Sequence, residues 1–177
     1  MREFASPATR VAALPLPVKV LYTAFCALTL AGLLSCVALY DGVVRFGART
    51  TPSELYDHLV AYYQSPARVR ERAGDAPPRM SARRLLEVTH FHLFSMPLYL
   101  LVAGHLFLLS GVGARAKMGW ISAAVAATAA HLFAPWGIYL AGAWLAWLYP
   151  ISGAALLASF AVLMGVPLYE MWNTAGG

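Results

Sequence analysis

Four long apolar runs dominate this chain of 177 residues. Each is close to the roughly 20 residues that an α-helix needs to cross the hydrocarbon layer of a membrane, which is about 30 Å thick. Lipid offers the backbone no hydrogen-bond partner, so such runs fold as helices whose amide groups satisfy one another. The predicted transmembrane helices cover approximately Val18–Tyr40, Val88–Gly111, Met118–Trp144 and Ile151–Met171.

The composition also indicates a membrane protein. Hydrophobic residues make up 60% of the chain and charged residues only 12%, whereas soluble domains carry about 25% charged residues. We therefore expect an all-α integral membrane protein, a four-helix transmembrane bundle in which residues 1–177 form one domain in contact with the lipid bilayer. The net charge of +5 does not indicate a nucleic-acid partner, because eight arginines share one loop with six acidic residues.

That loop, residues 41–87, is the one sizeable polar segment, and we expect it outside the membrane. Thr51-Pro52-Ser53-Glu54 has the capping residue, proline and early acid of a helix start. Apolar residues then recur at helical spacing as far as Tyr63, which predicts an amphipathic helix against the end of the bundle. Residues 66–80 are charged and contain glycine and proline, so we expect a solvated excursion. Residues 81–87 are expected to form a further turn leading into the second transmembrane helix.

An even number of spans places both termini on one side of the membrane. Lys19, Arg115 and Lys117 lie on that side, and arginines near the helix ends on the loop side nearly balance them. Cytoplasmic segments of membrane proteins tend to be basic, but long loops follow this rule less closely than short ones. Both lysines of the chain lie on the side of the termini, which favours that side as the cytoplasmic one. We therefore expect cytoplasmic termini in a bacterial inner membrane. Cys26 and Cys36 are expected to be small buried side chains, and no CxxCH motif for covalent haem attachment is present.

Histidines inside the apolar runs are the main indication of function. His90, His92 and His105 lie in the second run and His131 lies in the third, whereas His58 is expected to be an ordinary loop residue. Imidazole within a bilayer is costly unless it has a partner or a metal ion. The four histidines of the spans are therefore candidate metal ligands.

Helical geometry places His90 and His105 near one face. At about 100° and 1.5 Å per residue, these two histidines point about 60° apart and lie about 22 Å apart along the axis. His92 points almost opposite to His90, on a stripe shared with Met96 and Tyr99. One helix thus carries a histidine near each membrane surface, a geometry that suits two stacked haems.

A haem with two histidine ligands needs neutral imidazoles on facing helices. It also needs small residues that let the flat macrocycle approach the backbone. Gly104 precedes His105, and the small residues Ala124, Ala127 and Thr128 share the His131 face. Pro97 and Pro135 are expected to kink their helices and so widen the bundle beside the histidines. These small residues and prolines are the features of the sequence that favour a cofactor site.

The pairing of ligands stays open. If the second and third helices are symmetric about their loop, His105 lies opposite about residue 124 and His131 opposite about residue 98, an offset of roughly 10 Å. A haem could then join His131 to His105, or to His90 or His92, or take a ligand from another subunit. Tilted helices or a displaced register would be needed for any pair within one chain.

The segment Thr89–Gly111 and the alanine-rich helix around His131 resemble the ligand helices of bacterial membrane b-type cytochromes. The chain is also similar to uncharacterised four-helix membrane proteins. The cytochrome resemblance implies one or two haem b groups and electron exchange with quinone or with partner redox subunits. The haem ligands it puts forward are His90, His105 and His131. Arg83 and Arg84 are expected to bind haem propionates or to dock the partner.

Two other functions stay open, and no enzymatic reaction is assigned. His90, His92 and Met96, with Met80 nearby, could bind copper, because imidazole and thioether are ligands that copper accepts. Alternatively, the chain is a non-catalytic subunit of a larger membrane complex, and its histidines pack or bind a pigment.

Overall fold

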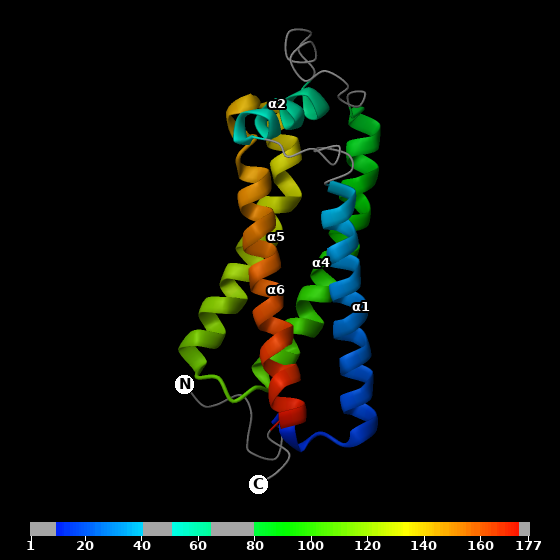
Figure 1. Ribbon diagram of the computed structural model, residues 1–177, viewed down its shortest axis with the longest axis vertical. Helices are drawn as coiled ribbons and strands as arrows, with labels where there is room; N and C mark the ends of the chain where they lie inside the picture. The colour runs from blue at the N-terminus through cyan, green and yellow to red at the C-terminus, as the bar shows by residue number, and fades with distance from the viewer. Residues whose placement is uncertain (1–9, 41–50, 65–79, 174–177) are drawn as a thin grey trace.

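The computed structural model describes residues 10–40, 51–64 and 80–173, which contain helices and no strand. Four helices are long and apolar enough to cross a membrane, and the shorter α2 is not among them. This confirms the predicted all-α transmembrane bundle (Figure 1). The helices are α1 (Leu16–Tyr40), α2 (Pro52–Tyr63), α4 (Ala82–Leu108), α5 (Ala114–Leu140) and α6 (Leu148–Asn173), with short 3₁₀ turns η2 (Val11–Ala13) and η4 (Ala143–Leu145).

The spans are not packed equally. α5 and α6 form the closest pair, α4 packs against both of them, and α1 meets α6. α4 is upright in its upper half and slants towards α6 in its lower half (Figure 1), as expected for a helix that contains Pro97. α2 lies across the end of the bundle opposite to the ends of α1 and α6 that are nearest the termini. It covers α5 and the turn between α5 and α6.

Several helix boundaries differ from the prediction, among them the start of α4 and the end of α5. α4 begins at Ala82, so the turn predicted over 81–87 continues into the span, and the Ser81 hydroxyl accepts a hydrogen bond from the amide of Arg84 at 3.2 Å. α5 ends at Leu140 and not at Trp144. Gly142 causes the earlier end, because its φ of 137° is a backbone conformation that other residues rarely adopt. The aromatic segment that follows becomes η4 and the start of α6.

The predicted start of α2 is confirmed. The Thr51 hydroxyl accepts from the Glu54 amide at 3.4 Å, and the Glu54 carboxylate accepts from the Thr51 amide at 2.6 Å, with Pro52 in the first position. This reciprocal pair satisfies amides that a helix start leaves without partners. The inward face of α2 is buried, as its amphipathic pattern predicts; its buried residues are Leu59, Val60, Ala61 and Tyr63. The predicted solvated excursion over 66–80 lies outside the described residues, apart from Met80.

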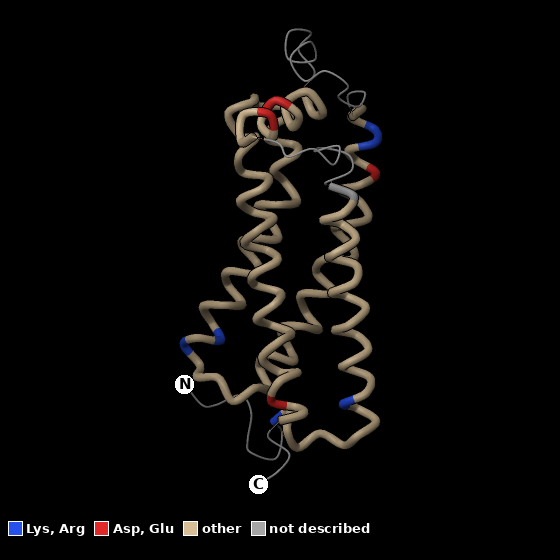
Figure 2. Tube along the Cα trace, in the orientation of Figure 1, with Lys and Arg blue, Asp and Glu red and all other residues tan. Residues whose placement is uncertain are grey.

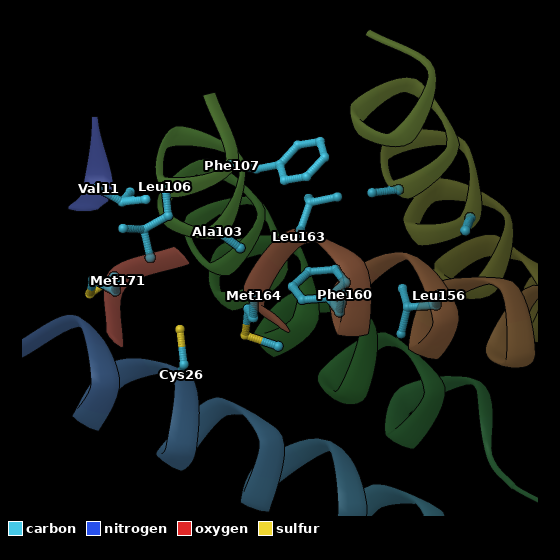
Figure 3. Packing of buried hydrophobic residues seen from close by; sticks show 12 residues of the cluster. Val11, Cys26, Ala103, Leu106, Phe107, Leu156, Phe160, Leu163, Met164 and Met171 are labelled. Carbon is cyan, nitrogen blue, oxygen red and sulfur yellow. The ribbon is translucent and has the colours of Figure 1, made fainter. Parts of the chain in front are cut away.

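Buried apolar residues gather in two clusters at different ends of the bundle. One joins the lower parts of α4 and α6 to α1 and η2 (Figure 3), with members that include Val11, Cys26, Ala103, Phe107, Phe160 and Met164. The other lies beneath α2 and contains Leu59, Val60, Tyr63, Leu85, Ile138 and Ala146.

The prediction that both cysteines are buried is confirmed for Cys26 and wrong for Cys36, which is exposed. Cys36 lies in the far half of α1, where exposed apolar side chains predominate.

Lysines hold the other end of the bundle together. Lys117 Nζ donates to the carbonyls of Leu108 and Ser110 at 2.7 and 2.8 Å, and Lys19 Nζ donates to the carbonyl of Met171 at 2.8 Å. These ammonium groups satisfy carbonyls at the C-terminal ends of α4 and α6, where the helix dipole favours positive charge. The start of α1 therefore lies beside the end of α6, as an even number of spans predicts, and charged residues mark the two ends of the bundle (Figure 2).

The capping box of α2 makes the helix sensitive to acid. Hydrogen bonds from the Thr51 amide and hydroxyl lower the pKa of the Glu54 carboxyl. The carboxylate therefore stabilises α2 above the unfolded pKa of about 4.3, and this contribution is lost as the pH falls through the lower folded value. We expect hydrogen-exchange protection of the α2 amides to decrease over that interval. In Glu54→Gln, which does not titrate, the protection should be independent of pH there; a parallel decrease in both proteins would contradict this cause.

Candidate functional site

His131 on α5 lies in a closely fitted cradle built by the first turns of α6. Its Nδ1 atom is 3.3 Å from the Tyr149 carbonyl oxygen and 3.2 Å from Ser152 Oγ. The Tyr149 ring stacks on the imidazole at 4.5 Å between centroids and 27° between planes. Gly153 completes the cradle, because a Cβ atom there would lie 3.2 Å from His131 Cε1. Backbone and side chains of one short segment thus set the position of the imidazole.

The hydrogen bonds of this cradle fix the tautomer of His131. A carbonyl oxygen can only accept, and the Ser152 hydroxyl already donates to the Tyr149 carbonyl at 3.0 Å. Nδ1 of His131 is therefore the protonated nitrogen, which leaves the lone pair on Nε2. A histidine that ligates a metal is commonly oriented in this way, with one ring nitrogen bound to a carbonyl and the other turned to the metal.

His92 on α4 has the same arrangement. Its Nδ1 lies 2.7 Å from the carbonyl oxygen of Val88, one turn earlier in the helix, so Nδ1 donates and Nε2 keeps the lone pair. His92 is partly buried, and it lies one turn of α4 from Thr89, whose hydroxyl accepts a hydrogen bond from Trp136 of α5. The structure therefore brings one histidine of α4 towards His131, and it is His92.

Side-chain contacts between α4 and α5 correct the register assumed from the sequence. Trp136 Nε1 donates to Thr89 Oγ1 at 2.8 Å near one end of the pair, and Lys117 Nζ reaches the Leu108 carbonyl at the other. Both contacts place His131 level with about residue 94, which is about 3 Å along the axis from His92. The sequence placed it opposite about residue 98, because the turn between the two helices was predicted over residues 112–117, whereas α4 already ends at Leu108 and α5 begins at Ala114.

The inner face of α4 is buried at its two ends and partly buried between them. Buried residues of this face are Leu85 and Thr89 at the α2 end and Ala103 and Phe107 at the other. Between these, His92 and Met96 are only partly buried, and Tyr99 is 39% exposed. Met96 still packs against the buried cluster that contains Ala127 of α5, and the Tyr99 ring lies 6.2 Å from the Phe25 ring of α1. The inner face of α4 is therefore less buried at the level of His92 than at its ends.

The structure does not bring His90 or His105 to His131. Both histidines are exposed on the outer face of α4, where the His90 ring meets the Phe94 ring edge-on at 5.0 Å between centroids. His105 lines an open groove of about 320 Å³ between α1 and α4, together with Tyr22, Leu101 and Val102. The sequence-based assignment of these two histidines as haem ligands stays a prediction.

The small residues on the His131 face of α5 are covered by protein. Ala124 and Ala127 are buried in the cluster that includes Leu156 and Phe160 of α6, and the Thr128 hydroxyl donates to the Ala124 carbonyl at 2.7 Å. The expectation that these residues leave room for a cofactor is therefore wrong, because α6 occupies that face. The partly buried surface nearest to His131 lies instead on the inner face of α4, around His92.

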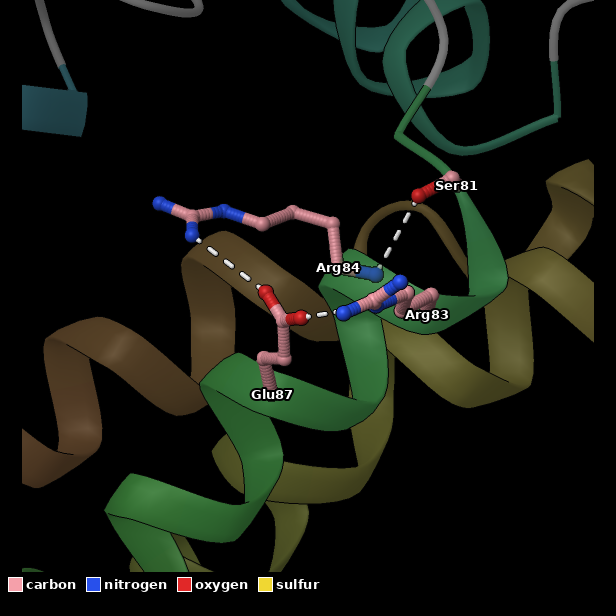
Figure 4. Close-up of polar contacts among 4 residues, drawn as sticks. All are labelled: Ser81, Arg83, Arg84 and Glu87. Carbon is pink, nitrogen blue, oxygen red and sulfur yellow. Dashed lines mark hydrogen bonds and ion pairs between the residues drawn. The ribbon is translucent and has the colours of Figure 1, made fainter.

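Arg83 and Arg84 lie in the first turn of α4, outside the cluster of histidines. Each pairs with Glu87, at 3.1 and 3.5 Å respectively, and both guanidinium groups are largely exposed (Figure 4). Exposed pairs of this kind contribute little to stability. A role for either arginine in binding propionates or docking a partner stays a prediction.

The residues suggested for copper are not brought together. His90 faces outward, whereas His92 and Met96 belong to the inner face of α4, and no group of three or more potential His, Cys, Asp or Glu metal ligands occurs in the part of the chain that is described. His58 lies in α2 and not in a loop, and its Nδ1 atom is buried.

The sequence analysis missed the cradle of His131. The predicted spans placed Tyr149 between the third and fourth transmembrane helices and Ser152 and Gly153 at the start of the fourth, without a site role. The available signal was weak: Ser152-Gly153 is a pair of small residues, one of them polar, in the helix that follows the His131 helix.

Two glycines of α6 provide a matched test of this cradle. A Cβ at Gly153 would lie 3.2 Å from Cε1 and 3.4 Å from Nδ1 of His131, whereas a Cβ at Gly165 would meet nothing within 4 Å. We expect Gly153→Ala to displace the imidazole and to lower the stability of the detergent-solubilised protein by about 1–3 kcal/mol. Gly165→Ala should be neutral or stabilising by up to about 1 kcal/mol. Equal thermal unfolding of the two variants would contradict the close fit.

Residues 55–176 match the model of a family described as a transmembrane helical domain. No curated protein and no solved structure matches the chain. The family match supports the membrane-spanning helical domain predicted from the sequence. It adds no support for the resemblance to b-type cytochromes, which stays a prediction.

Proposed function

Since the chain belongs to this family of transmembrane helical domains, we propose that it is a membrane electron-transfer domain that binds one haem b between α4 and α5. The ligands in this proposal are His92 and His131. One observation carries it: on each histidine Nδ1 is bonded to a backbone carbonyl, so Nε2 is the nitrogen with the lone pair. Both imidazoles also lie at nearly the same level of facing helices, so that the two of them could hold one haem.

The packing of α4 supports the proposal. A flat macrocycle needs space between two helices at the depth of its ligands, and closely packed helices do not provide it. The inner face of α4 is buried above and below the level of His92 but not at it. Met96, one turn further along this face, would then lie beside the haem. When bound, the haem would supply one-electron redox chemistry, while the chain orients both imidazoles and excludes water.

Four single substitutions to leucine test the ligand pair. We expect His92→Leu and His131→Leu each to abolish haem binding, because each removes one of two iron ligands. His90→Leu and His105→Leu remove exposed imidazoles from the same helix and should keep the wild-type amount. The measurement is haem per protein, by the pyridine haemochrome method, on protein purified from cells supplied with 5-aminolevulinate, with circular dichroism as the check of folding.

The outcomes separate the candidate functions. Haem lost from His105→Leu but kept in His92→Leu would refute the proposed pair and support the assignment made from the sequence. A wild-type protein that is colourless under these conditions would refute the haem proposal. It would leave the second candidate, a structural subunit of a larger membrane complex. That candidate is favoured by the small buried share of α1, of whose most apolar stretch only 11% is buried within the chain.

The proposal also places a quinone in the groove between α1 and α4. The groove combines an apolar lining with two hydrogen-bonding side chains, Tyr22 and His105. A quinone has the matching chemistry, because its ring is apolar and its carbonyl oxygens accept hydrogen bonds. The groove lies on the terminal side of the bundle, so electrons would pass along α4 between this groove and the haem.

Binding of decylubiquinone to the purified protein tests this assignment. We expect His105→Leu to weaken binding at least tenfold, and Tyr22→Phe to weaken it several-fold, about the effect of one hydrogen bond. The titration follows quenching of tryptophan fluorescence, with His90→Leu as the control that changes an exposed imidazole outside the groove. Equal affinity in all four proteins would show that the quinone partitions into detergent and not into the groove.

We also infer that the termini face the cytoplasm of a bacterial cell and that the bundle lies in the inner membrane. Lys19, Arg115 and Lys117 lie at the terminal end of the described helices, and Glu170 is the one acidic residue described there. At the opposite end, Arg83 and Arg84 are paired with Glu87. A surplus of positive charge marks the cytoplasmic side. A partner redox protein would then approach the end covered by α2.

A further inference from the structure

We propose that Tyr149 and Tyr63 are positioning residues for His131, so that docking of the surface helix α2 sets the orientation of an imidazole inside the membrane. The inference deepens the proposed function, because His131 is one of the two proposed haem ligands. The contacts that carry it belong to the protein chain alone, and they can be tested whether or not haem binds.

The first step is the contact between Tyr149 and His131. The Tyr149 ring stacks on the imidazole, and the Tyr149 carbonyl oxygen lies 3.3 Å from His131 Nδ1. Stacking fixes the plane of the imidazole, and the hydrogen bond fixes its rotation within that plane. Tyr149 thus makes two of the contacts that orient His131, and the Ser152 hydroxyl makes a third at 3.2 Å from Nδ1. Displacement of the Tyr149 ring removes the contact that sets the plane of the imidazole.

The second step joins Tyr149 to α2. The rings of Tyr63 and Tyr149 lie 6.0 Å apart between centroids at 57°, and their side chains share a hydrogen bond. Tyr63 is only 5% exposed, and its ring also meets that of Tyr62 at 5.0 Å, edge to face. Tyr63 is thus fixed within α2, and it presents a fixed surface to Tyr149.

The third step is the docking of α2 itself. Leu59 and Val60 are buried in one cluster with Ile138 of α5 and Ala146 of the turn before α6. Tyr56 makes a separate contact by stacking on Trp147, with centroids 6.1 Å apart and planes at 30°. α2 therefore touches the bundle at two aromatic contacts, of which only the one through Tyr63 leads to His131.

A consequence follows for any partner that binds at this end of the bundle. Lifting or shifting α2 withdraws Tyr63 from Tyr149, and Tyr149 then no longer holds the imidazole in one orientation. The hydrogen bond to Nδ1 raises the basicity of the imidazole as a ligand through Nε2. A redox partner that displaces α2 would in this way change the strength of the His131 bond to iron and, with it, the reduction potential.

The two aromatic contacts of α2 provide the matched variants for the test. Tyr63→Leu and Tyr56→Leu each remove one aromatic ring from α2, but only Tyr63→Leu removes the contact with Tyr149. Tyr63→Phe is the mild variant, which keeps the ring and loses only the hydroxyl. The readout is the Nδ1–H cross-peak of His131 in NMR spectra of full-length protein labelled with ¹⁵N-histidine, assigned by its loss in His131→Leu. Dithionite keeps any bound haem in the diamagnetic, low-spin ferrous state.

We expect a single sharp Nδ1–H cross-peak in the wild type and in Tyr56→Leu. In Tyr63→Leu the cross-peak should broaden beyond detection, because the imidazole gains a second orientation and its proton exchanges; in Tyr63→Phe it should shift but persist. An unchanged cross-peak in Tyr63→Leu would overturn the inference, as would equal loss in Tyr56→Leu and Tyr63→Leu. Haem content of the same samples is measured separately, so failure of the haem proposal would leave this result interpretable.

Discussion

The structure depends on one constraint: within lipid, the chain itself must provide a hydrogen-bond partner for each of its backbone groups. The four spans satisfy this constraint along their length by being helical. Their ends require additional groups, because the last carbonyls of a helix have no amide to accept from. Lys117 supplies the donors at the end of α4 and Lys19 at the end of α6. Both lysines thereby join two segments of the chain as well as completing a helix.

The same constraint explains how the polar side chains of the spans are used. Thr128 and Ser159 donate to the carbonyl four residues earlier in their own helices, at 2.7 Å each. His92 makes the same kind of bond, and His131 uses the carbonyl at the start of α6. A hydroxyl group has its one proton satisfied by such a bond, whereas an imidazole keeps a second ring nitrogen with a lone pair. This difference in chemistry separates the two inward-facing histidines from the other polar residues of the spans.

Much of the architecture could be predicted from the sequence, and the site could not. The length of the apolar runs was sufficient for the four spans, and Thr51-Pro52-Ser53-Glu54 was sufficient for the start of α2, because both signals are local. The end of α5 was missed, since only the unusual backbone of Gly142 stops that helix. The turn between α4 and α5 was also placed too late, because α4 ends at Leu108 and α5 begins at Ala114. This second error moved the register of the two helices by about four residues, roughly 6 Å. A shift of that size decides which histidines lie level with one another.

The neighbours of His131 could not be predicted from the sequence for a different reason. Tyr149 and Gly153 become its cradle only when α6 packs on α5, a contact between segments about 20 residues apart that no local pattern encodes.

The two apolar clusters determine which parts of α4 are buried against the rest of the bundle. They hold the ends of α4 against the rest of the chain, and the part of α4 between them has only partial burial on its inner face. A group bound between His92 and His131 would bridge α4 and α5 at the level where the inner face of α4 is only partly buried. Because such a group binds the folded bundle and not the unfolded chain, its binding free energy would add to the stability of the fold. Function and stability would then depend on the same two imidazoles.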